Sequence, residues 1–182
     1  MSALSTYDIN YKSLSNGDHK LQFTVNQEFF DAIEGDLILG GNLVADLSIH
    51  KTEQMLQLHF DINGTIRAVC DVCLDEFNYP IEDAEGDMVV KFGDHTEELS
   101  EELYMIDEAE DVINVAQWIY EFIAVTLPIR MEHPEDENGN PTCNPEMLAK
   151  VNEYMTDTNS TKDEDESIDP RWAALKDLVD KK

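Results

Sequence analysis

The residue types best suited to chemistry in this sequence are two closely spaced cysteines, in Cys70-Asp71-Val72-Cys73. This spacing can place both sulfurs on one metal ion, or it can form a redox pair of the thioredoxin type. The redox alternative expects the pair at the start of a helix that follows a strand, whereas strand-like patterns lie on both sides here. The favoured interpretation is therefore half of a structural zinc site, carried on a hairpin.

A closed zinc site needs two more ligands, and His133 and Cys143 flank the Pro- and Gly-containing segment 134–141. The set Cys70, Cys73, His133 and Cys143 would be tetrahedral and structural, because catalytic zinc keeps an open position. The spacing between the two halves matches no common zinc finger, so three ordinary packed or partly exposed thiols are the alternative. The other histidines are isolated and expected on a solvated face: His19, His50, His59 and His95.

No catalytic constellation stands out elsewhere in the sequence. It contains no Gly-rich phosphate loop, no His-Glu-x-x-His and no Gly-x-Ser-x-Gly. With 40 Asp and Glu residues, no carboxylate pair is distinctive enough to mark an acid and a base. The sequence therefore predicts a protein that is not an enzyme.

The composition is strongly acidic, with 12 Lys and Arg against 40 Asp and Glu and a formal net charge of −28. Binding of DNA or RNA phosphates through a basic face is excluded, because that mode needs clustered cations. There is no apolar run of 18 or more residues, and residues 1–10 lack the layout of a secretory signal. We therefore expect a cytoplasmic protein with no membrane or DNA partner.

Period-two alternation of apolar and polar residues over residues 20–93 predicts strands with one buried face. The strands are expected around residues 21–25, 43–49, 56–62, 65–69, 77–81 and 88–92, with an acidic turn at 82–87. Alternation of this kind is typical of antiparallel sheets. The predicted fold class is α+β, with a curved, barrel-like antiparallel sheet.

Helices are predicted in the second half of the chain. The apolar residues of 114–127 form one stripe that must lie on the sheet, and Pro128 ends that helix. A further helix is expected from Pro145 to Tyr154 with Asn144 as its cap, and a short one over residues 169–179. A short helical turn at 27–33 is the least marked of these patterns. The apolar stripe of 114–127 is made by Val115, Trp118, Ile119, Phe122 and Ile123.

Two acidic stretches divide the chain. Residues 94–111 hold nine acidic and no basic residues, and residues 152–169 hold seven acidic and one basic. The like charges within each stretch repel one another. We therefore expect the first stretch to form an acidic loop and the second to form a linker. We predict one α+β domain over 1–150, an acidic linker over 151–168 and an amphipathic docking segment over 169–182. Its partner-binding side chains would be Trp172, Leu175 and Leu178. The alternative is that the same side chains dock on the protein's own sheet domain.

The order of these features resembles the YceD family of large-subunit ribosomal RNA accumulation proteins, in the form of its Bacteroidetes-like members. The resemblance covers residues of about 20–178 and rests on Cys70 to Leu74, an acidic stretch, Leu127-Pro128 and Asp169-Pro170-Arg171-Trp172. Cysteine-rich members carry a second cluster of cysteines where this chain has only His133 and Cys143, and other members have fewer still. The metal therefore cannot be essential to the family role.

The resemblance implies a role in keeping 23S ribosomal RNA at normal levels, during its synthesis or large-subunit assembly. The charge favours a basic ribosomal protein or assembly factor as the partner, because attraction between opposite charges speeds encounter. Direct RNA contact would have only a small cluster available, Lys176, Lys181 and Lys182. The alternative is a metal-dependent or redox enzyme that acts on ribosomal RNA or protein.

Overall fold

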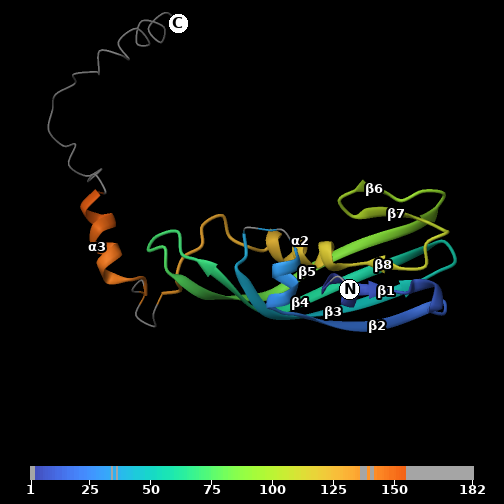
Figure 1. The fold of residues 1–182 in the computed structure, drawn as a ribbon, viewed down its shortest axis with the longest axis horizontal. Coiled ribbons are helices and arrows are strands. Elements are labelled where there is room, and N and C mark those ends of the chain that lie inside the picture. The colour runs from blue at the N-terminus through green and yellow to red at the C-terminus, as the bar shows by residue number, and fades with distance from the viewer. Residues whose placement is uncertain (1–2, 34, 36, 136–138, 140–141, 155–182) are drawn as a thin grey trace, which may run out of the picture.

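The fold is an α+β arrangement built on one six-stranded sheet with the order β2-β3-β4-β5-β7-β6 (Figure 1). The computed structural model describes residues 3–33, 35, 37–135, 139 and 142–154. The strands of the large sheet are β2 (Gly17–Val25), β3 (Gly40–Lys51), β4 (Met55–Val69), β5 (Glu76–Gly93), β6 (Glu97–Ser100) and β7 (Leu103–Asp107). The short strands β1 (Asp8–Ile9) and β8 (Ile113–Asn114) pair with each other.

Few helices accompany the sheet. They are α1 (Gln27–Ala32), α2 (Ala116–Val125) and α3 (Pro145–Tyr154), with two 3₁₀ turns, η1 (Ala3–Tyr7) and η2 (Tyr11–Ser13). None of the helices in the described part of the chain is both long and apolar enough to span a membrane. The segment 169–179 and its predicted docking side chains Trp172, Leu175 and Leu178 lie outside the described residues.

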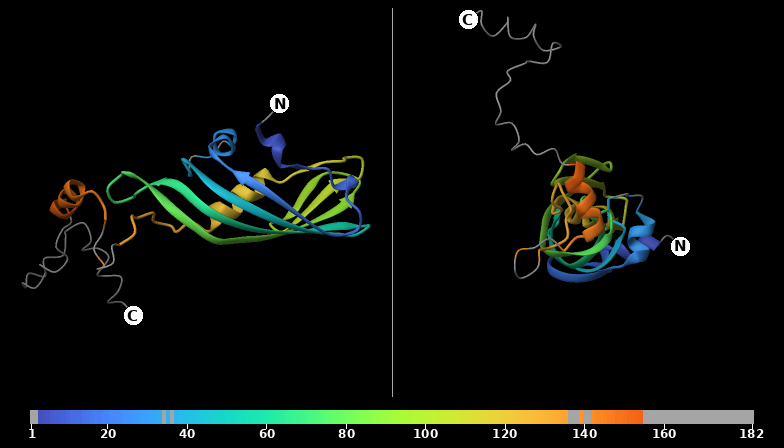
Figure 2. Two further views of the ribbon diagram at one scale, coloured as in Figure 1. Left: turned by 90° about the horizontal axis from the view of Figure 1, so that it is seen from below. Right: turned by 90° about the vertical axis from the view of Figure 1, so that its left-hand side faces the viewer.

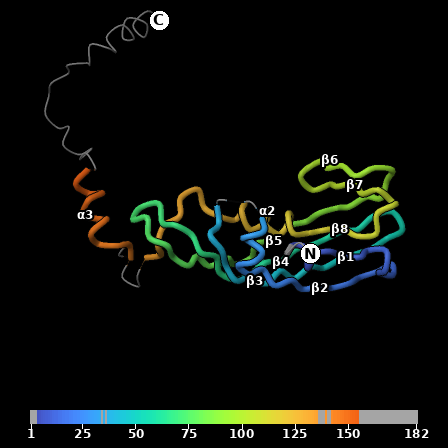
Figure 3. Tube along the Cα trace, in the orientation of Figure 1, coloured from blue at the N-terminus to red at the C-terminus, as the bar shows by residue number. Residues whose placement is uncertain are grey.

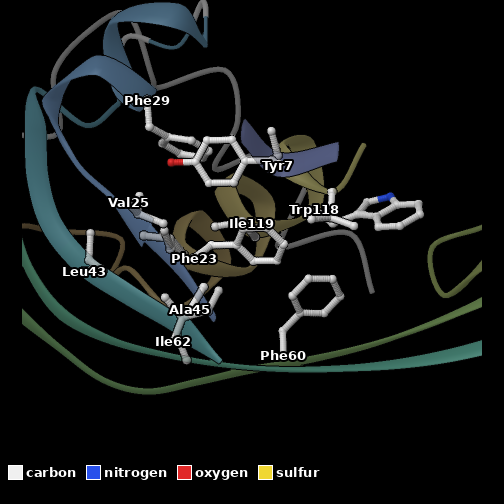
Figure 4. Packing of buried hydrophobic residues seen from close by; sticks show 14 of the residues in the cluster. Tyr7, Phe23, Val25, Phe29, Leu43, Ala45, Phe60, Ile62, Trp118 and Ile119 are labelled. Carbon is white, nitrogen blue, oxygen red and sulfur yellow. The ribbon is translucent and has the colours of Figure 1, made fainter. Parts of the chain in front are cut away.

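Figure 2 shows α2 lying on the inner face of the curved sheet. The hydrophobic core contains buried residues of both. Alternate residues of β3 and β4 point inward and are buried: Leu43, Ala45, Leu47, Ile49, Leu56, Leu58, Phe60 and Ile62. The buried side chains of α2 include Trp118, Ile119 and Ile123, and Figure 4 shows Trp118 and Ile119 with their neighbours from the sheet. The α+β class and the predicted alternation are therefore confirmed.

Two expectations about β5 and the closure of the sheet need correction. The predicted turn at 82–87 does not exist, because β5 runs unbroken from Glu76 to Gly93. The irregularity is a bulge, in which Glu82 and Asp83 together oppose Asn63 of β4. Asp83 has φ 56° and its N–H donates to Asn63 Oδ1, so the local bend is absorbed within the strand. Among the described strands β2 and β6 are unpaired edges, so the barrel-like closure is not confirmed.

The predicted acidic loop at 94–111 is also wrong, because this stretch forms a hairpin of β6 and β7. β7 pairs with β5 in parallel and β6 pairs with β7 antiparallel. All four side chains of β6 are exposed. An edge strand can expose side chains on both faces, so a run of charges fits this position as well as it fits a loop.

The outer face of the sheet carries a row of three adjacent carboxylates. Asp46 of β3 is the register partner of Asp61 in β4, and Asp61 is the partner of Glu85 in β5. Like charges placed directly opposite each other in a sheet are destabilising. Further acidic residues, Glu82, Asp83 and Asp87, follow on β5.

Candidate metal centre

The two cysteines of the Cys-x-x-Cys motif lie in the turn that joins β4 to β5. The N–H of Cys70 donates to the carbonyl of Asp75, and the N–H of Leu74 donates to the carbonyl of Cys70, both at 2.9 Å. These bonds fold the turn tightly, and Leu74 takes up φ 64° to complete it. The Val72 N–H points at Cys70 Sγ at 3.4 Å. Both thiols are consequently buried on the same side of the turn, with exposures of 0% for Cys70 and 2% for Cys73.

The segment after α2 is held against this turn by reciprocal hydrogen bonds. The N–H of Asp71 donates to the carbonyl of Met131 at 2.8 Å, and the N–H of Met131 donates to Asp71 Oδ2 at 2.7 Å. The His133 ring lies on the ring of Phe77, with 4.6 Å between ring centroids. The trace in Figure 3 shows this segment passing the end of the β4–β5 hairpin before the chain reaches α3.

Cys143 is positioned from the other side by the residue that follows it. Asn144 Nδ2 donates to Asp75 Oδ2 at 3.2 Å, and the carbonyl of Asn144 accepts the Leu148 N–H within α3. Cys143 is 6% exposed. Asp71 and Asp75, whose hydrogen bonds position these segments, were not among the residues predicted from the sequence. Their place inside and beside the Cys-x-x-Cys motif is the one signal that could have marked them.

These contacts bring the four candidate ligands Cys70, Cys73, His133 and Cys143 together, with all ligand atoms within 4.8 Å of one another. Cys70 Sγ lies 3.7 Å from Cys143 Sγ. The His133 Nδ1 atom lies 3.5 Å from Cys73 Sγ and 3.6 Å from Cys143 Sγ. On one tetrahedral zinc ion, two sulfurs would lie about 3.8 Å apart, and a sulfur and a nitrogen about 3.6 Å apart, from bonds of about 2.3 and 2.0–2.1 Å. The donor set and its spacing therefore fit zinc.

The thiols of Cys70 and Cys143 differ in their readiness to ionise. Burial raises the pKa of Cys70, but hydrogen bonds from the N–H groups of Cys73 and Val72 and from His133 outweigh it and lower this pKa to about 6. Burial, together with the neighbouring sulfur of Cys70, raises the pKa of Cys143 to about 11. Without metal, the pair thus holds one proton on Cys143 and a thiolate on Cys70.

The arrangement suits a structural metal better than a reaction. Four protein ligands complete a tetrahedral shell and leave no position for a substrate or a reactive water. The Cys-x-x-Cys pair lies in a hairpin turn, not at the start of a helix where thioredoxin-type pairs are found. The hydrogen bonds between Asp71 and Met131 and between Asn144 and Asp75 hold in place the segments that carry the four ligands.

Comparisons with known proteins identify the family of this chain. No curated protein and no solved structure matches it. A family model does match, under the description large ribosomal RNA subunit accumulation protein YceD, over residues 58–179. This range is 122 of the 182 residues and contains all four candidate metal ligands. The chain therefore belongs to the YceD family.

Proposed function

We propose that this protein is a non-enzymatic factor that supports accumulation of 23S ribosomal RNA by binding a basic ribosomal protein or assembly factor during large-subunit biogenesis. The family description supports the role in large-subunit ribosomal RNA. The nature of the partner is our inference from charge.

The observation that carries the proposal is the ordered acidic hairpin of β6 and β7. The stretch 94–111 contains nine carboxylates and no cation, and its strands extend the sheet beyond β5. Backbone pairing to β5 holds these charges in a fixed arrangement, so a partner meets them without the entropic cost of ordering a loop. A concentrated, preorganised negative edge attracts basic proteins and repels nucleic acid phosphates.

Zinc would have a supporting role in this scheme. Bound to Cys70, Cys73, His133 and Cys143, it would tie the β4–β5 hairpin to the start of α3 and add its binding free energy to folding. The closed donor set favours this structural role over the alternative, a metal-dependent or redox enzyme, because such an enzyme needs an open position or an accessible thiol.

The test is a pulldown from a lysate of the cells that express the chain, before and after nuclease treatment and at low and high salt. We expect basic ribosomal proteins or assembly factors to be recovered at low salt and lost at high salt, because exposed charge pairs are screened. The informative variant is Glu97→Gln with Glu101→Gln and Glu102→Gln. Its matched control makes the same change of charge on the outer face of the sheet, with Asp46→Asn, Asp61→Asn and Glu85→Gln.

The hairpin variant should lose the partner while the control retains it. Equal recovery with both variants would contradict the proposal that the hairpin carries the interaction. Recovery of only ribosomal RNA fragments before nuclease treatment, with no basic protein after it, would contradict the adaptor function itself.

A further inference from the structure

A cavity of about 410 Å³ lies between the acidic hairpin and α2. Its wall combines two aromatic residues, Tyr104 of β7 and Trp118 of α2, with four carboxylates. The carboxylates come from four separate places in the chain: Asp8, Glu98, Glu110 and Glu121. Its volume falls within the range of pockets that hold organic ligands, about 300–1,000 Å³.

The aromatic wall also offers a hydrogen-bond donor, the indole N–H of Trp118. Trp118 is 9% exposed and packs edge-on against Tyr104, with 5.4 Å between ring centroids. Figure 4 shows its indole ring extending away from Ile119. Among the described residues no buried polar side-chain atom lacks a partner, so the indole N–H, which takes part in no hydrogen bond with those residues, is open to solvent in the cavity. A ligand that supplies a carbonyl oxygen could accept a hydrogen bond from it.

The carboxylates of the cavity have no cation beside them. None of the ion pairs in the described residues includes Asp8, Glu98, Glu110 or Glu121. Three of them accept hydrogen bonds from neutral groups only: Asp8 from Asn114, Glu110 from Thr96 and Glu121 from Gln117. Burial and the charges of Glu110 and Glu98 raise the pKa of Tyr104, which places these charges near its ring.

A metal ion is the wrong kind of cation for this cavity. The carboxylates surround it without converging, since the convergent group of metal-ligating side chains among the described residues is the cysteine and histidine cluster. Aromatic faces attract organic cations, and the guanidinium of arginine also stacks on them. An arginine within a peptide presents both the cation and a main-chain carbonyl.

We propose that this cavity binds an arginine side chain of a basic peptide segment, with the guanidinium between Tyr104, Trp118 and the carboxylates and a peptide carbonyl on the indole N–H. The proposal rests on the proposed function, since it names the part of a basic partner that the protein recognises. It adds a specific pocket to the diffuse attraction of the hairpin.

The experiment is a titration of the full chain followed by the indole ¹H–¹⁵N resonance of Trp118, in a Trp172→Phe background that leaves one tryptophan. The probe is a tri-arginine peptide with blocked ends, and its control is a tri-citrulline peptide, which has the same shape without the charge. We expect the Trp118 resonance to shift and saturate with tri-arginine and to stay in place with tri-citrulline.

Variants separate the cavity from general charge attraction. Glu98→Gln with Glu121→Gln should weaken tri-arginine binding by about tenfold or more, because two charges that face the ligand are lost. Asp46→Asn with Asp61→Asn makes the same change of charge on the outer face of the sheet and should leave binding unchanged. Trp118→Phe keeps an aromatic ring and removes the indole N–H, and it should also weaken binding. Because this variant has no indole resonance at position 118, its binding is followed by the backbone resonances of α2.

Equal shifts with tri-arginine and tri-citrulline, or equal losses in the cavity and control variants, would overturn the cavity as an arginine site. These failures are distinct from failure of the proposed function. A partner that is recovered in the pulldown regardless of Glu98 and Glu121 would remove the cavity and leave the adaptor role. Tri-arginine binding without any recovered basic protein would do the reverse.

Discussion

The aromatic ring of Phe122 in α2 lies directly on the backbone of Gly86 in β5. A Cβ built on Gly86 would lie 2.3 Å from carbons of that ring, so the absence of a side chain is what allows the helix to approach the sheet here. Gly86 is also the register partner of Phe60, whose ring lies 5.2 Å from the ring of Phe122. The helix α2 therefore packs against the sheet at the Phe60–Gly86 pair.

This contact predicts that Gly86→Ala and Phe122→Ala are each destabilising and that their effects on the free energy of unfolding are strongly coupled. Gly86→Ala should lower the free energy of unfolding by about 1–3 kcal/mol through overpacking, and Phe122→Ala by about 2 kcal/mol, since its ring is only half-buried. Chemical denaturation of the single and double variants measures the coupling. In the Phe122→Ala background, Gly86→Ala should lower the free energy of unfolding much less than it does alone. If the two losses were additive, the two residues would not share one contact.

The candidate metal centre predicts stoichiometric zinc that is lost when a ligand is removed. Cys70→Ser, Cys73→Ser and His133→Ala should each release the metal and lower the melting temperature, because structural zinc contributes directly to folding. Metal analysis together with thermal melting measures both effects. His19→Ala, which changes a histidine remote from the cluster, is the control. A metal-free protein of unchanged stability would end the zinc hypothesis.

The two thiol pKa values predict that zinc uptake releases protons. At about pH 7.5, Cys70, with a pKa of about 6, is already a thiolate, whereas Cys143, with a pKa of about 11, still carries its proton and must lose it to bind zinc. The affinity for zinc should consequently rise with pH. Calorimetry in two buffers with different ionisation enthalpies measures the number of protons released. A binding enthalpy that is the same in both buffers would contradict this expectation.

The positive φ of Leu74 predicts a stabilising substitution. Leucine in the left-handed region costs about 1–2 kcal/mol, and its side chain here is 67% exposed and contributes little burial. Leu74→Gly should therefore raise the free energy of unfolding by about 0.5–1 kcal/mol, after the entropy of glycine in the unfolded chain is subtracted. Asp83→Gly is the control, because Asp tolerates this conformation better and should gain less. A loss of stability in Leu74→Gly would mean that the exposed leucine makes a stabilising contact.

The row of carboxylates on the outer face predicts that Asp61→Asn is stabilising at low salt. Asp61 lies between Asp46 and Glu85 in register, so neutralising it removes repulsion with both and should add about 0.5 kcal/mol. The gain should fade in about 1 M salt, where the Debye length is about 3 Å. Denaturation at two ionic strengths measures it, with Glu53→Gln in the β3–β4 turn as the control. A loss that is independent of salt would show that the hydrogen bond Asp61 accepts from Asn63 Nδ2 outweighs the repulsion.

The central part of the fold was predictable from the sequence because burial leaves a periodic pattern. Inward residues of β3 and β4 alternate, and the stripe of α2 repeats at helical spacing. The hairpin of β6 and β7 was not predictable in this way. β6 is held by backbone hydrogen bonds at the edge of the sheet, and backbone pairing leaves no mark on a strand whose four side chains are all exposed. β7 is short, and only Ile106 in it is fully buried, so it lacks the longer alternation of β3 and β4. The bulge at Asp83 was predicted as a turn for a related reason, because acidic residues fit a turn as well as a bulge.

The candidate site was predictable as a set of residue types but not as a geometry. Cys70 and Cys73 are recognisable by spacing alone, and His133 and Cys143 by flanking the Pro- and Gly-containing segment 134–141. What brings the two halves together is the reciprocal pairing of Asp71 with Met131 and the hydrogen bond from Asn144 to Asp75. Such contacts join residues about 60–70 positions apart, and a single sequence carries no signal for pairings of that range.

The position of β6 also bears on how copies of this protein behave when they are crowded. An uncovered edge strand is a template onto which the strand of another molecule can add, which is the first step toward aggregates. Here the edge is four residues long and begins with Glu97 and Glu98. A second copy would have to bring its own carboxylates against them, at a repulsion that grows as the strands approach. The charges to which we assign a basic partner thus also oppose pairing between identical chains at this edge.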